Sequence, residues 1–471
     1  MKNSSHKTDV RYAGIRILRE VDDKGVFARE LISERCVQGD LSKRDKNLLT
    51  ELVNGVIRHC LSLDTLISFF SNIPLNKIEP WVLYSLRAGL YQIVYLDRIP
   101  VSAAVNTSVA IVKKLVRRTD AVRFTNAILR AIERSIQNKS ACEPEIADLQ
   151  KALYRRKNIW CTFHHPIFPD PVKHLSSSIA INYSHPEWLI KRWISRYGKE
   201  KTVAICKADN LVPKVFLRVN QEKMSTRKFL ALLDKEGISA RATDTAVVVE
   251  NIAVFEIPGF AEGLFFVQDI SAMKIAQFLK VEKSNTVLDM CAAPGGKTTH
   301  IAELLGNTGK IYALDISAKR LQLIKENCLR MGIHNVSIVC GDASDEKVPF
   351  QMKFDRILID APCSNTGVLS RRVEARWRLK EGDIKKLADL QYSILKTGAS
   401  LLKSNGYLVY STCSIEPEEN QDIVKKFMGI ESQFSLDAEA YYLPSVDEGD
   451  GGYMARLCKR QGCSQTKELT V

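Results

Sequence analysis

Strand-like and helix-like segments alternate along the chain from Thr286 onward, and no other feature constrains the fold as strongly. Five short apolar runs have the composition of strands: Thr286–Met290, Lys310–Leu314, Val336–Val339, Phe354–Ile359 and Tyr407–Tyr410. Helical stretches follow the first two runs and precede the fifth, at Lys297–Leu305, Ala318–Met331 and Asp383–Leu402. This alternation is typical of a parallel, doubly wound sheet. The C-terminal part of the chain is therefore predicted to be a Rossmann-like α/β domain.

Two cysteines stand just after the last two of these runs. Cys363 lies in an Asp-Ala-Pro-Cys-Ser sequence that begins at Asp360, and Cys413 lies in Ser-Thr-Cys-Ser. If both runs are strands of one parallel sheet, both thiols emerge at its carboxyl edge, where ligands bind in open α/β sheets. A free cysteine is more often a small buried hydrophobe. Two thiols at this edge nevertheless indicate covalent chemistry, in which one attacks and the other helps release.

The first strand-like run leads into a turn of small residues. Residues 289–298 are Asp-Met-Cys-Ala-Ala-Pro-Gly-Gly-Lys-Thr. This is not a phosphate-binding loop, because the first glycine of Gly-x-x-x-x-Gly-Lys-[Ser/Thr] would fall at Cys291, and the dinucleotide pattern Gly-x-Gly-x-x-Gly is also absent. A turn of this kind lets a ligand approach the backbone closely.

Acidic residues recur at the ends of successive runs, at Asp289, Asp315, Asp342 and Asp360. An acid after the second strand suits the hydroxyls of a ribose, and Asp342 is placed to meet an adenine amino group. One aspartate in a turn means little, but four at successive strand ends indicate a nucleoside. Without a strong phosphate site, the nucleoside cofactor is predicted to be S-adenosylmethionine. The predicted cofactor-binding residues are Cys291, Ala292, Ala293, Pro294, Gly295, Gly296, Lys297, Asp315, Arg320, Asp342 and Asp360.

The rest of the chain is organised differently. Apolar residues recur at helical spacing over the first ~135 residues, as at Leu83, Leu86, Leu90, Ile93 and Val94. Basic residues cluster between Ile111 and Arg123, and they form either a solvated face or a phosphate contact. Prolines interrupt residues 138–178, which are predicted to be a linker with one short helix at 146–156. A small β-α-β module follows, with strands at Lys214–Val219 and Ala246–Val249.

The composition fits a basic cytoplasmic protein. The net charge of +14 suits a polyanionic partner such as nucleic acid, although a soluble basic protein without such a partner would look the same. The 12 cysteines show no disulfide spacing, so we expect a reducing compartment. We expect no signal peptide and no membrane span, because no sufficiently long apolar stretch is present. Residues 161–165 contain a cysteine and two histidines without a second ligand pair, so no metal site is expected.

Several motifs resemble those of the RNA cytosine-C5 methyltransferases, the Nop2/Sun (NSUN) family. The resemblance is carried by Asp289–Lys297, Asp360–Ser364 and Thr412–Ser414, and by residues 259–263 and 267–269, which lead into that domain. The helical start resembles the NusB fold, at residues 52–58, 86–93 and 127–130. A NusB-like domain joined to this methyltransferase is the arrangement of the bacterial RsmB (Sun/Fmu) branch of the family. The resemblance covers nearly the whole chain, apart from residues 138–178 and the last few.

The resemblance implies a multidomain protein with four regions. They are a NusB-like helical RNA-binding domain at 1–137, a linker at 138–178, a small α/β RNA-binding module at 179–258 and a Rossmann-like methyltransferase domain at 259–463. The implied activity is S-adenosylmethionine-dependent methylation of carbon 5 of a specific cytosine in 16S rRNA. The implied substrate is single-stranded or loop RNA with the target base unstacked, and the enzyme is expected to act as a monomer without DNA, membrane or metal.

The resemblance also implies a role for each catalytic residue. Cys413 attacks carbon 6 of the ring, because carbon 5 alone is a poor nucleophile, and Cys363 assists elimination. Asp360 holds nitrogen 3 protonated as charge develops there. The chain departs from the family pattern at residues 370–377, where a stretch of the Arg-His-Pro-Asp type is usual, so the RNA contacts of this loop are open.

Alternatives remain open from the sequence. A DNA cytosine-C5 methyltransferase would use Cys363 as the nucleophile and would not need Cys413. A NusB-like RNA-binding factor with an inert methyltransferase fold is a second alternative, although it does not explain both thiols and Asp360. Lys297 and Arg320 are either cofactor contacts or surface charges. Arg218 and Asn220 either contact RNA or belong to a turn at the end of a strand.

Overall fold

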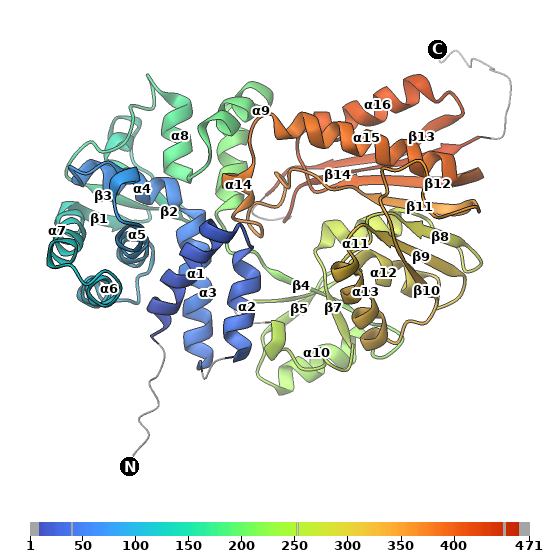
Figure 1. Cartoon of the computed structure of the whole chain (residues 1–471), viewed down its shortest axis with the longest axis horizontal. Helices are drawn as coiled ribbons and strands as arrows, with labels where there is room; N and C mark the ends of the chain where they lie inside the picture. The colour runs from blue at the N-terminus through green and yellow to red at the C-terminus, as the bar shows by residue number, and fades with distance from the viewer. Residues whose placement is uncertain (1–8, 39–40, 251, 253, 446–448, 461–471) are drawn as a thin grey trace. The chain divides into compact units, whose positions relative to one another are not determined.

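A computed structural model describes residues 9–38, 41–250, 252, 254–445 and 449–460 (Figure 1). The chain divides into two compact units. Unit 1 contains residues 1–211 together with the short segment 372–378, and unit 2 contains residues 212–371 and 379–471. Unit 2 therefore holds the strand and helix alternation on which the α/β prediction rests.

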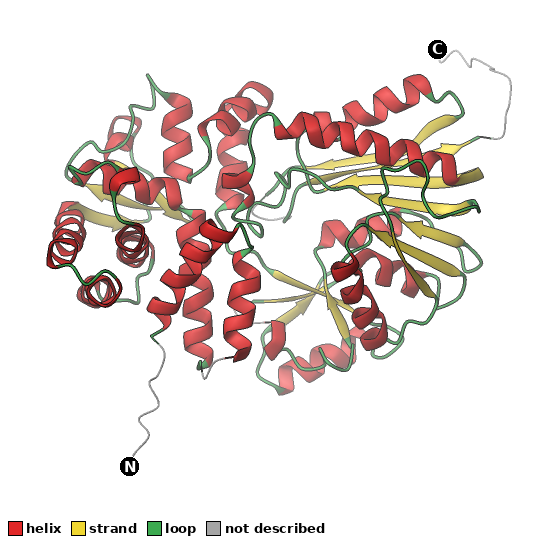
Figure 2. Cartoon of the chain, viewed as in Figure 1, coloured by secondary structure: helices red, strands yellow, loops and turns green. Residues whose placement is uncertain are grey.

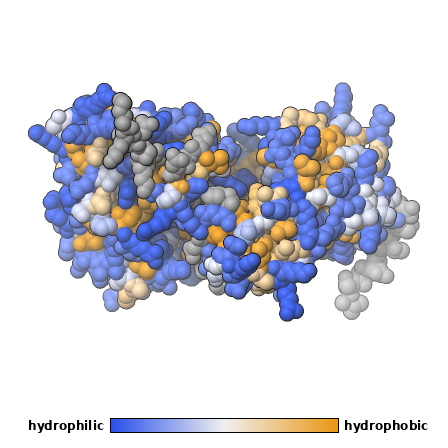
Figure 3. Space-filling model, turned by 90° about the horizontal axis from the view of Figure 1, so that it is seen from below, coloured by the Kyte–Doolittle hydropathy of each residue, from blue (hydrophilic) through white to orange (hydrophobic). Residues whose placement is uncertain are grey.

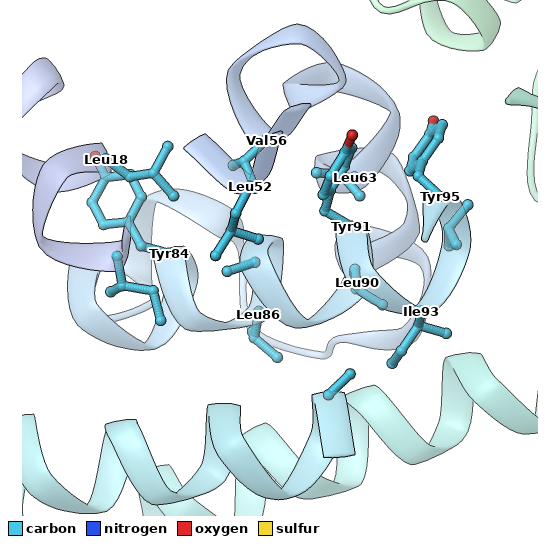
Figure 4. Packing of buried hydrophobic residues seen from close by; sticks show 14 of the residues in the cluster. Leu18, Leu52, Val56, Leu63, Tyr84, Leu86, Leu90, Tyr91, Ile93 and Tyr95 are labelled. Carbon is cyan, nitrogen blue, oxygen red and sulfur yellow. The ribbon is translucent and has the colours of Figure 1, made fainter. Parts of the chain in front are cut away.

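Helices α1 to α7 build the first part of unit 1, and they confirm the predicted helical N-terminal region. They span Val10–Lys24, Ala28–Gln38, Lys43–Arg58, Cys60–Phe70, Pro80–Tyr95, Val101–Leu115 and Thr119–Ser135. Capping side chains fix two of the starts: Asp9 accepts a hydrogen bond from the N–H of Arg11, and Ser42 accepts one from the N–H of Asp45. The apolar faces meet in one core around α5 (Figure 4), where Leu52, Leu63, Leu86 and Leu90 are fully buried.

Helices α3 and α5 approach each other closely at Gly55. A Cβ atom at this position would lie 2.0 Å from the Cζ atom of Tyr91, so no larger residue fits without movement of that ring. The Tyr91 hydroxyl donates a hydrogen bond to Glu51 at 2.6 Å, which holds the ring in place. The small residue in α3 therefore lets an aromatic residue of α5 pack against its backbone.

A small antiparallel sheet occupies part of the region predicted to be a linker. Its strands are β1 (Ile136–Ser140), β2 (Ala152–Arg156) and β3 (Ile159–Phe163), in the order β1-β3-β2. The helix predicted at 146–156 is wrong, because only a 3₁₀ turn at Ile146–Lys151 precedes β2. Lys157 and Asn158 form the tight turn between β2 and β3 with positive φ angles of 45° and 59°. No glycine marks this turn, so the hairpin lacks its usual sequence signal.

The inner residues of this sheet explain why the segment is ordered. Leu153, Cys161 and Phe163 are fully buried and belong to the same core as the N-terminal helices. Helices α8 (Leu175–Tyr183) and α9 (Glu187–Asp209), which has a non-helical residue at Gly198, complete the consecutive part of unit 1. The prolines therefore punctuate a folded segment, and the linker interpretation does not hold for β2 and β3.

The segment 372–378, with the short helix α14 (Ala375–Arg378), is part of unit 1 although its neighbours in sequence belong to unit 2. The Arg376 side chain has no exposed surface and donates hydrogen bonds to the carbonyl oxygens of Arg58, Ser184 and Asp209 and to Asn210 Oδ1, at 2.9–3.3 Å. Trp377 donates to the carbonyl oxygen of Ile57 at 2.7 Å. This segment overlaps the loop that departs from the family pattern at residues 370–377, and from residue 372 onward that loop is a structural part of unit 1.

Unit 2 begins with a small antiparallel sheet and one helix. The strands β4 (Val215–Val219), β5 (Ala240–Ala242), β6 (Val247–Val249) and β7 (Phe265–Val267) have the order β5-β6-β4-β7. Helix α10 (Thr226–Lys235) packs its apolar side on this sheet, and Phe229, Leu233 and Phe265 are fully buried between them. The predicted β-α-β elements are present, and β5 and β7 extend them.

The large sheet of unit 2 has seven strands in the order β10-β9-β8-β11-β12-β14-β13. The predicted strands are β8 (Thr286–Asp289), β9 (Lys310–Asp315), β10 (Val336–Cys340), β11 (Phe354–Asp360) and β12 (Leu402–Thr412), and all five run parallel. Two further strands, β13 (Phe434–Tyr442) and β14 (Gly452–Lys459), pair antiparallel at one edge, so the sheet is mixed rather than wholly parallel.

Helices cover both faces of this sheet (Figure 2). One face packs against α11 (Ile270–Phe278), α12 (Gly296–Leu304) and α13 (Ala318–Met331), and the other packs against α15 (Asp383–Leu401) and α16 (Gln421–Ile430). The chain moves outward from β8 through β9 to β10 and then returns to β11 on the other side of β8. The strand order therefore reverses between β8 and β11, and ligands bind at such a reversal in open α/β sheets.

Two kinds of feature are absent among the described residues: a membrane-spanning helix and a cluster of metal ligands. No helix there is both long and apolar enough to cross a membrane, and no group of three or more His, Cys, Asp or Glu side chains is placed to hold a metal ion. The face shown in Figure 3 carries apolar residues in several separate groups among hydrophilic ones. Exposed large hydrophobic residues such as Phe27, Val172 and Leu329 are correspondingly spread over distant parts of the sequence.

Candidate active site

Cys363 and Cys413 lie side by side at the carboxyl edge of the large sheet. They follow β11 and β12, which are adjacent parallel strands with Asp360 opposite Ser411. Because the two strands end at the same level, the chain segments after them bring the two Sγ atoms to 3.2 Å from each other. Both residues keep some exposed surface.

The environments of the two thiols differ. Two causes raise the pKa of Cys363 well above its ordinary value: the hydrogen bond with Cys413, which has the larger effect, and burial. Cys413 Sγ also donates to Asn365 Oδ1 at 3.2 Å, and Asn365 Nδ2 donates to the carbonyl oxygen of Cys363 at 2.8 Å. Cys363 therefore keeps its proton. Cys413 Sγ contacts both Cys363 Sγ and Asn365 Oδ1.

Asp360 occupies the end of β11 and points toward the first turn of α12. Its Oδ2 atom lies 2.6 Å from Lys297 Nζ, and its Oδ1 atom accepts a hydrogen bond from Ser411 at 3.0 Å. Burial alone would lower the pKa of Lys297, but the Asp360 carboxylate outweighs burial and raises it. The structure therefore pairs two of the predicted site residues, and Lys297 is not a free surface charge.

The turn after β8 lies at the same edge as the thiol pair. Asp289 is buried at its start, where Thr298 Oγ1 donates to its Oδ2 atom at 2.7 Å. Burial raises the pKa of Asp289 to about 7. Among the described residues, its buried Oδ1 atom has no hydrogen-bond partner. The rest of the turn contains Cys291, Ala292, Ala293, Pro294 and Gly295, with Gly295 at a φ of 98°, and Gly296 and Lys297 begin α12.

Asp315 connects the end of β9 to this turn. Its Oδ2 atom accepts from the N–H of Ala293 at 3.1 Å and lies 3.4 Å from Arg320 Nη1, while its Oδ1 atom accepts from the N–H of Ser317 at 3.0 Å. Arg320 also donates to the carbonyl oxygen of Ala293 at 2.6 Å. Asp342 is exposed after β10, the neighbouring strand, and accepts hydrogen bonds from Ser344. The predicted cofactor residues thus gather along the ends of β8, β9 and β10.

Sequence reasoning missed Glu419, which binds the residues that directly follow the two cysteines. Its fully buried carboxylate accepts hydrogen bonds from the N–H of Ser364 at 2.8 Å, from Gln391 Nε2 at 3.0 Å and from Ser414 Oγ at 2.5 Å, and it also accepts one from Ser364 Oγ. Glu418 and Glu419 follow Cys413 closely in sequence, which was the available signal. A pair of acids reads as a solvated turn, because nothing in the sequence shows that one of them is buried.

Arg218 and Asn220 are buried inside unit 2. Arg218 is 4% exposed and donates to Gln268, to the carbonyl oxygen of Gly296 at 2.8 Å, and to Thr299 and Glu303. Asn220 is 1% exposed and donates to the carbonyl oxygens of Gly263 and Met331. Of the two interpretations left open, the structure favours the structural one, because these side chains connect the small sheet to α12 and α13.

Comparisons with known proteins give the same three-part organisation. Three family models match the chain: the NusB family at residues 8–134, the ferredoxin-like domain of RsmF/B-like methyltransferases at 185–253, and 16S rRNA methyltransferase RsmB/F at 276–458. The crystal structure of PH0851 covers 96% of this chain and 100% of its own, with a TM-score of 0.74 and 23% identity, which shows a shared fold.

Two relatives extend the likeness over almost the whole chain. The probable ribosomal RNA small subunit methyltransferase B of Bacillus subtilis is 35% identical over 436 residues, which are 92% of this chain and 90% of the relative. The ribosomal RNA small subunit methyltransferase B of Proteus mirabilis is 34% identical over 461 residues, which are 96% of this chain and 99% of the relative. With this coverage and identity, and with the RsmB/F methyltransferase model matching the domain that holds the thiol pair, the chain belongs to the ribosomal RNA small subunit methyltransferase B family.

Proposed function

We propose that this protein transfers a methyl group from S-adenosylmethionine to carbon 5 of a cytosine in 16S rRNA, through a transient bond between Cys413 and carbon 6. The observation that carries the proposal is the thiol pair, with its two Sγ atoms 3.2 Å apart and Asp360 at the end of the same strand that precedes Cys363. The names of the relatives support ribosomal RNA as the substrate.

The residues at the ends of β8, β9 and β10 fit the proposed cofactor. Asp289 offers a buried Oδ1 atom without a partner in the described structure, which can accept a hydrogen bond from an amino group. Asp315 and Asp342 supply carboxylates for ribose hydroxyls and for an adenine amino group, as the sequence predicts, and the turn offers no phosphate-binding loop. When bound, S-adenosylmethionine supplies an electrophilic methyl group.

The two cysteines support a division of labour. The Cys413 thiolate adds to carbon 6, and the ring becomes an enamine whose carbon 5 is nucleophilic. After carbon 5 has gained the methyl group, its proton passes to water and the electron pair of that C–H bond restores the double bond between carbons 5 and 6. The carbon 6–sulfur bond breaks in the same elimination and releases Cys413 as a thiolate. Cys363 keeps its proton at neutral pH and lies next to the departing sulfur, so it can assist that elimination.

Asp360 acts on the base rather than on sulfur. Its carboxylate is held by Lys297 and Ser411 and is about one-third exposed, so one side remains open to a ligand. There it can hold nitrogen 3 of cytosine in its protonated state while charge develops on the ring. The base must leave its stack to reach the thiol pair, so the proposed substrate is a single-stranded or loop region. The monomeric state expected from the sequence stays a prediction.

A radiolabel experiment tests the proposal. Tritiated S-adenosylmethionine is incubated with the full chain and 16S rRNA, with DNA of the same sequence, or without nucleic acid. We expect label only in the RNA, at carbon 5 of one cytosine after digestion to nucleosides. Label in DNA would favour the alternative with Cys363 as nucleophile, and no label in any sample would favour the inert RNA-binding factor.

A further inference from the structure

We propose that Glu419 is a positioning residue that sets the separation of the two active-site thiols; this inference rests on the proposed two-cysteine reaction. Glu419 lies in the short 3₁₀ turn Pro417–Glu419, six residues after Cys413 (419 − 413). Its carboxylate accepts hydrogen bonds from Ser364 and Ser414, the residues that directly follow the two cysteines. We derive its role from the two chain segments that it joins in this way.

One carboxylate binds the residue that follows each cysteine. Ser364 comes directly after Cys363 and donates both its N–H, at 2.8 Å, and its hydroxyl to Glu419. Ser414 comes directly after Cys413 and donates its hydroxyl at 2.5 Å. Glu419 therefore joins the two strand-end segments through one buried side chain. It adds to direct contacts between them, since Ser364 Oγ lies 3.0 Å from Ser414 Oγ and the N–H of Gly367 donates to the carbonyl oxygen of Cys413 at 2.9 Å.

A second group extends this bridge to the other side of Cys363. Gln391 Nε2, from α15, donates to Glu419 at 3.0 Å and to the carbonyl oxygen of Pro362 at 2.8 Å. Gln391, Ser364 and Ser414 have almost no exposed surface, so water does not compete for these hydrogen bonds. Cys363 is thus fixed at the residues before and after it. Cys413 is held on both sides as well, because Thr412 Oγ1 donates to Asn420 Oδ1 at 2.5 Å.

The separation of the sulfurs matters because one thiol must assist the departure of the other. At 3.2 Å the two Sγ atoms are in hydrogen-bond contact, and a relative shift of about 1 Å between the two segments would break that contact. Misplacement of this size at a reacting centre costs roughly a hundredfold in rate. The bridge at Glu419 is the buried charged group that holds both segments at this spacing, together with the direct hydrogen bonds between them.

The experiment compares Glu419→Ala, Glu419→Gln and Ser414→Ala in the full chain. Glutamine keeps the shape and can serve both sides of the bridge, because the serine hydroxyls can accept as well as donate. We expect turnover to fall about ten- to a hundredfold in Glu419→Ala and about threefold in Glu419→Gln, with Ser414→Ala between them and KM for S-adenosylmethionine unchanged. Asp422→Asn, at an acid three residues further along, is the matched control and should match the wild type.

A chemical measurement reports the spacing without methyl transfer. Phenylarsine oxide binds tightly to two neighbouring thiols. The amount that the wild type retains, minus the amount that Cys363→Ala retains, is the arsenical signal of the pair formed by Cys363 and Cys413. We expect Glu419→Ala to lose most of this signal while iodoacetamide still alkylates Cys413, and Glu419→Gln to keep it. Because this signal needs no substrate, failure of methyl transfer in the wild type would overturn the proposed function and leave this test intact.

Two results would overturn the inference. One is an unchanged arsenical signal in Glu419→Ala, and the other is equal loss of turnover in the alanine and glutamine variants. If Glu419→Ala does not fold, as judged by thermal unfolding, Ser414→Ala decides, because it removes one hydroxyl and leaves the carboxylate paired with Ser364 and Gln391. An unchanged arsenical signal and full turnover in Ser414→Ala would then count against the bridge.

Discussion

At the scale of single residues, the site depends on a few side chains whose partners lie far away in sequence. Lys297 and Asp360 form an ion pair at 2.6 Å, and Cys363 and Cys413 are in contact, although 63 and 50 positions separate the members of each pair. These residues could be found from the sequence because each lies at or just after the end of a strand, or in the first turn of a helix, of a recognisable pattern. Glu419 could not, because a buried carboxylate has no signature apart from its partners.

The two cysteines should fail in different ways. Without Cys413 no bond to carbon 6 can form, so Cys413→Ala should abolish both turnover and the covalent complex. Without Cys363 the adduct can form and accept methyl, but its breakdown slows, so Cys363→Ala should accumulate enzyme joined to RNA. A denaturing gel shows this as a shifted band. The reverse pattern would make Cys363 the nucleophile, and full activity of both variants would refute the mechanism.

Asp289 should make stability depend on pH. Burial raises its pKa to about 7, above the ~3.9 of an unfolded chain, so the folded protein binds this proton more tightly. The stabilisation from this group is complete below about pH 4 and is lost as pH rises through about 7. Asp289→Asn carries no charge at any pH, so its stability relative to the wild type should rise by about 1–3 kcal/mol between pH 5 and pH 8.

Urea unfolding of the protein without ligands at both pH values measures this difference. Asp345→Asn is the control, because Asp345 is exposed, and its stability relative to the wild type should not change with pH. A constant difference between Asp289→Asn and the wild type would show that Asp289 is ionised in the folded state.

At the scale of helices and strands, the sequence predicts best where a pattern has one interpretation. The five parallel strands alternate with amphipathic helices, and all five are present. Strands β13 and β14 were missed, although Phe434, Leu436 and Ala438 alternate with polar residues, because they follow one another without an intervening helix. The β2–β3 hairpin was missed because Lys157 and Asn158 adopt positive φ angles that glycine usually supplies.

Two helical glycines, one in a tight helix contact and one in open space, should respond in opposite ways to substitution by alanine. Gly55→Ala would place a Cβ atom 2.0 Å from the Tyr91 ring, so we expect a loss of about 1–3 kcal/mol in the free energy of unfolding. Gly429 lies in α16 with no atom within 4 Å of the corresponding position, so Gly429→Ala should stabilise by about 0.5–1 kcal/mol. Urea unfolding curves give both values, and a stable Gly55→Ala variant would mean that α3 and α5 can separate at little cost.

At the scale of the whole molecule, the positive net charge suits the polyanionic RNA that we propose as the substrate. The chain carries a net charge of +14, and exposed basic residues cluster at the end of α6, in the turn that follows it and at the start of α7 in unit 1. The residues of the candidate active site all lie in unit 2. We therefore expect unit 1 to bind or position the RNA while unit 2 transfers the methyl group.

Neutralising this cluster should separate RNA binding from cofactor binding. In a full chain with Lys113, Arg117 and Arg123 changed to glutamine, the KM for 16S rRNA should rise and its salt dependence should weaken, by about 0.7–0.9 in logarithmic slope for each phosphate that the protein no longer neutralises. Affinity for S-adenosylmethionine, measured by calorimetry, should not change. The control changes Lys24, Arg29 and Arg44, which are exposed elsewhere in unit 1. Equal effects of both sets would indicate that only net charge matters.

The burial of Arg376 in unit 1 has a consequence for the order in which a newly made chain can fold. Residues 1–211 leave the ribosome 165 residues before Arg376 does (376 − 211), and synthesis at ~5–20 residues per second makes that interval roughly 8–33 s. Throughout this time the carbonyl groups of Arg58, Ser184 and Asp209 lack the donor that they share in the finished protein. The N-terminal helices therefore reach their final packing only after β11, the strand that precedes Cys363, has been made.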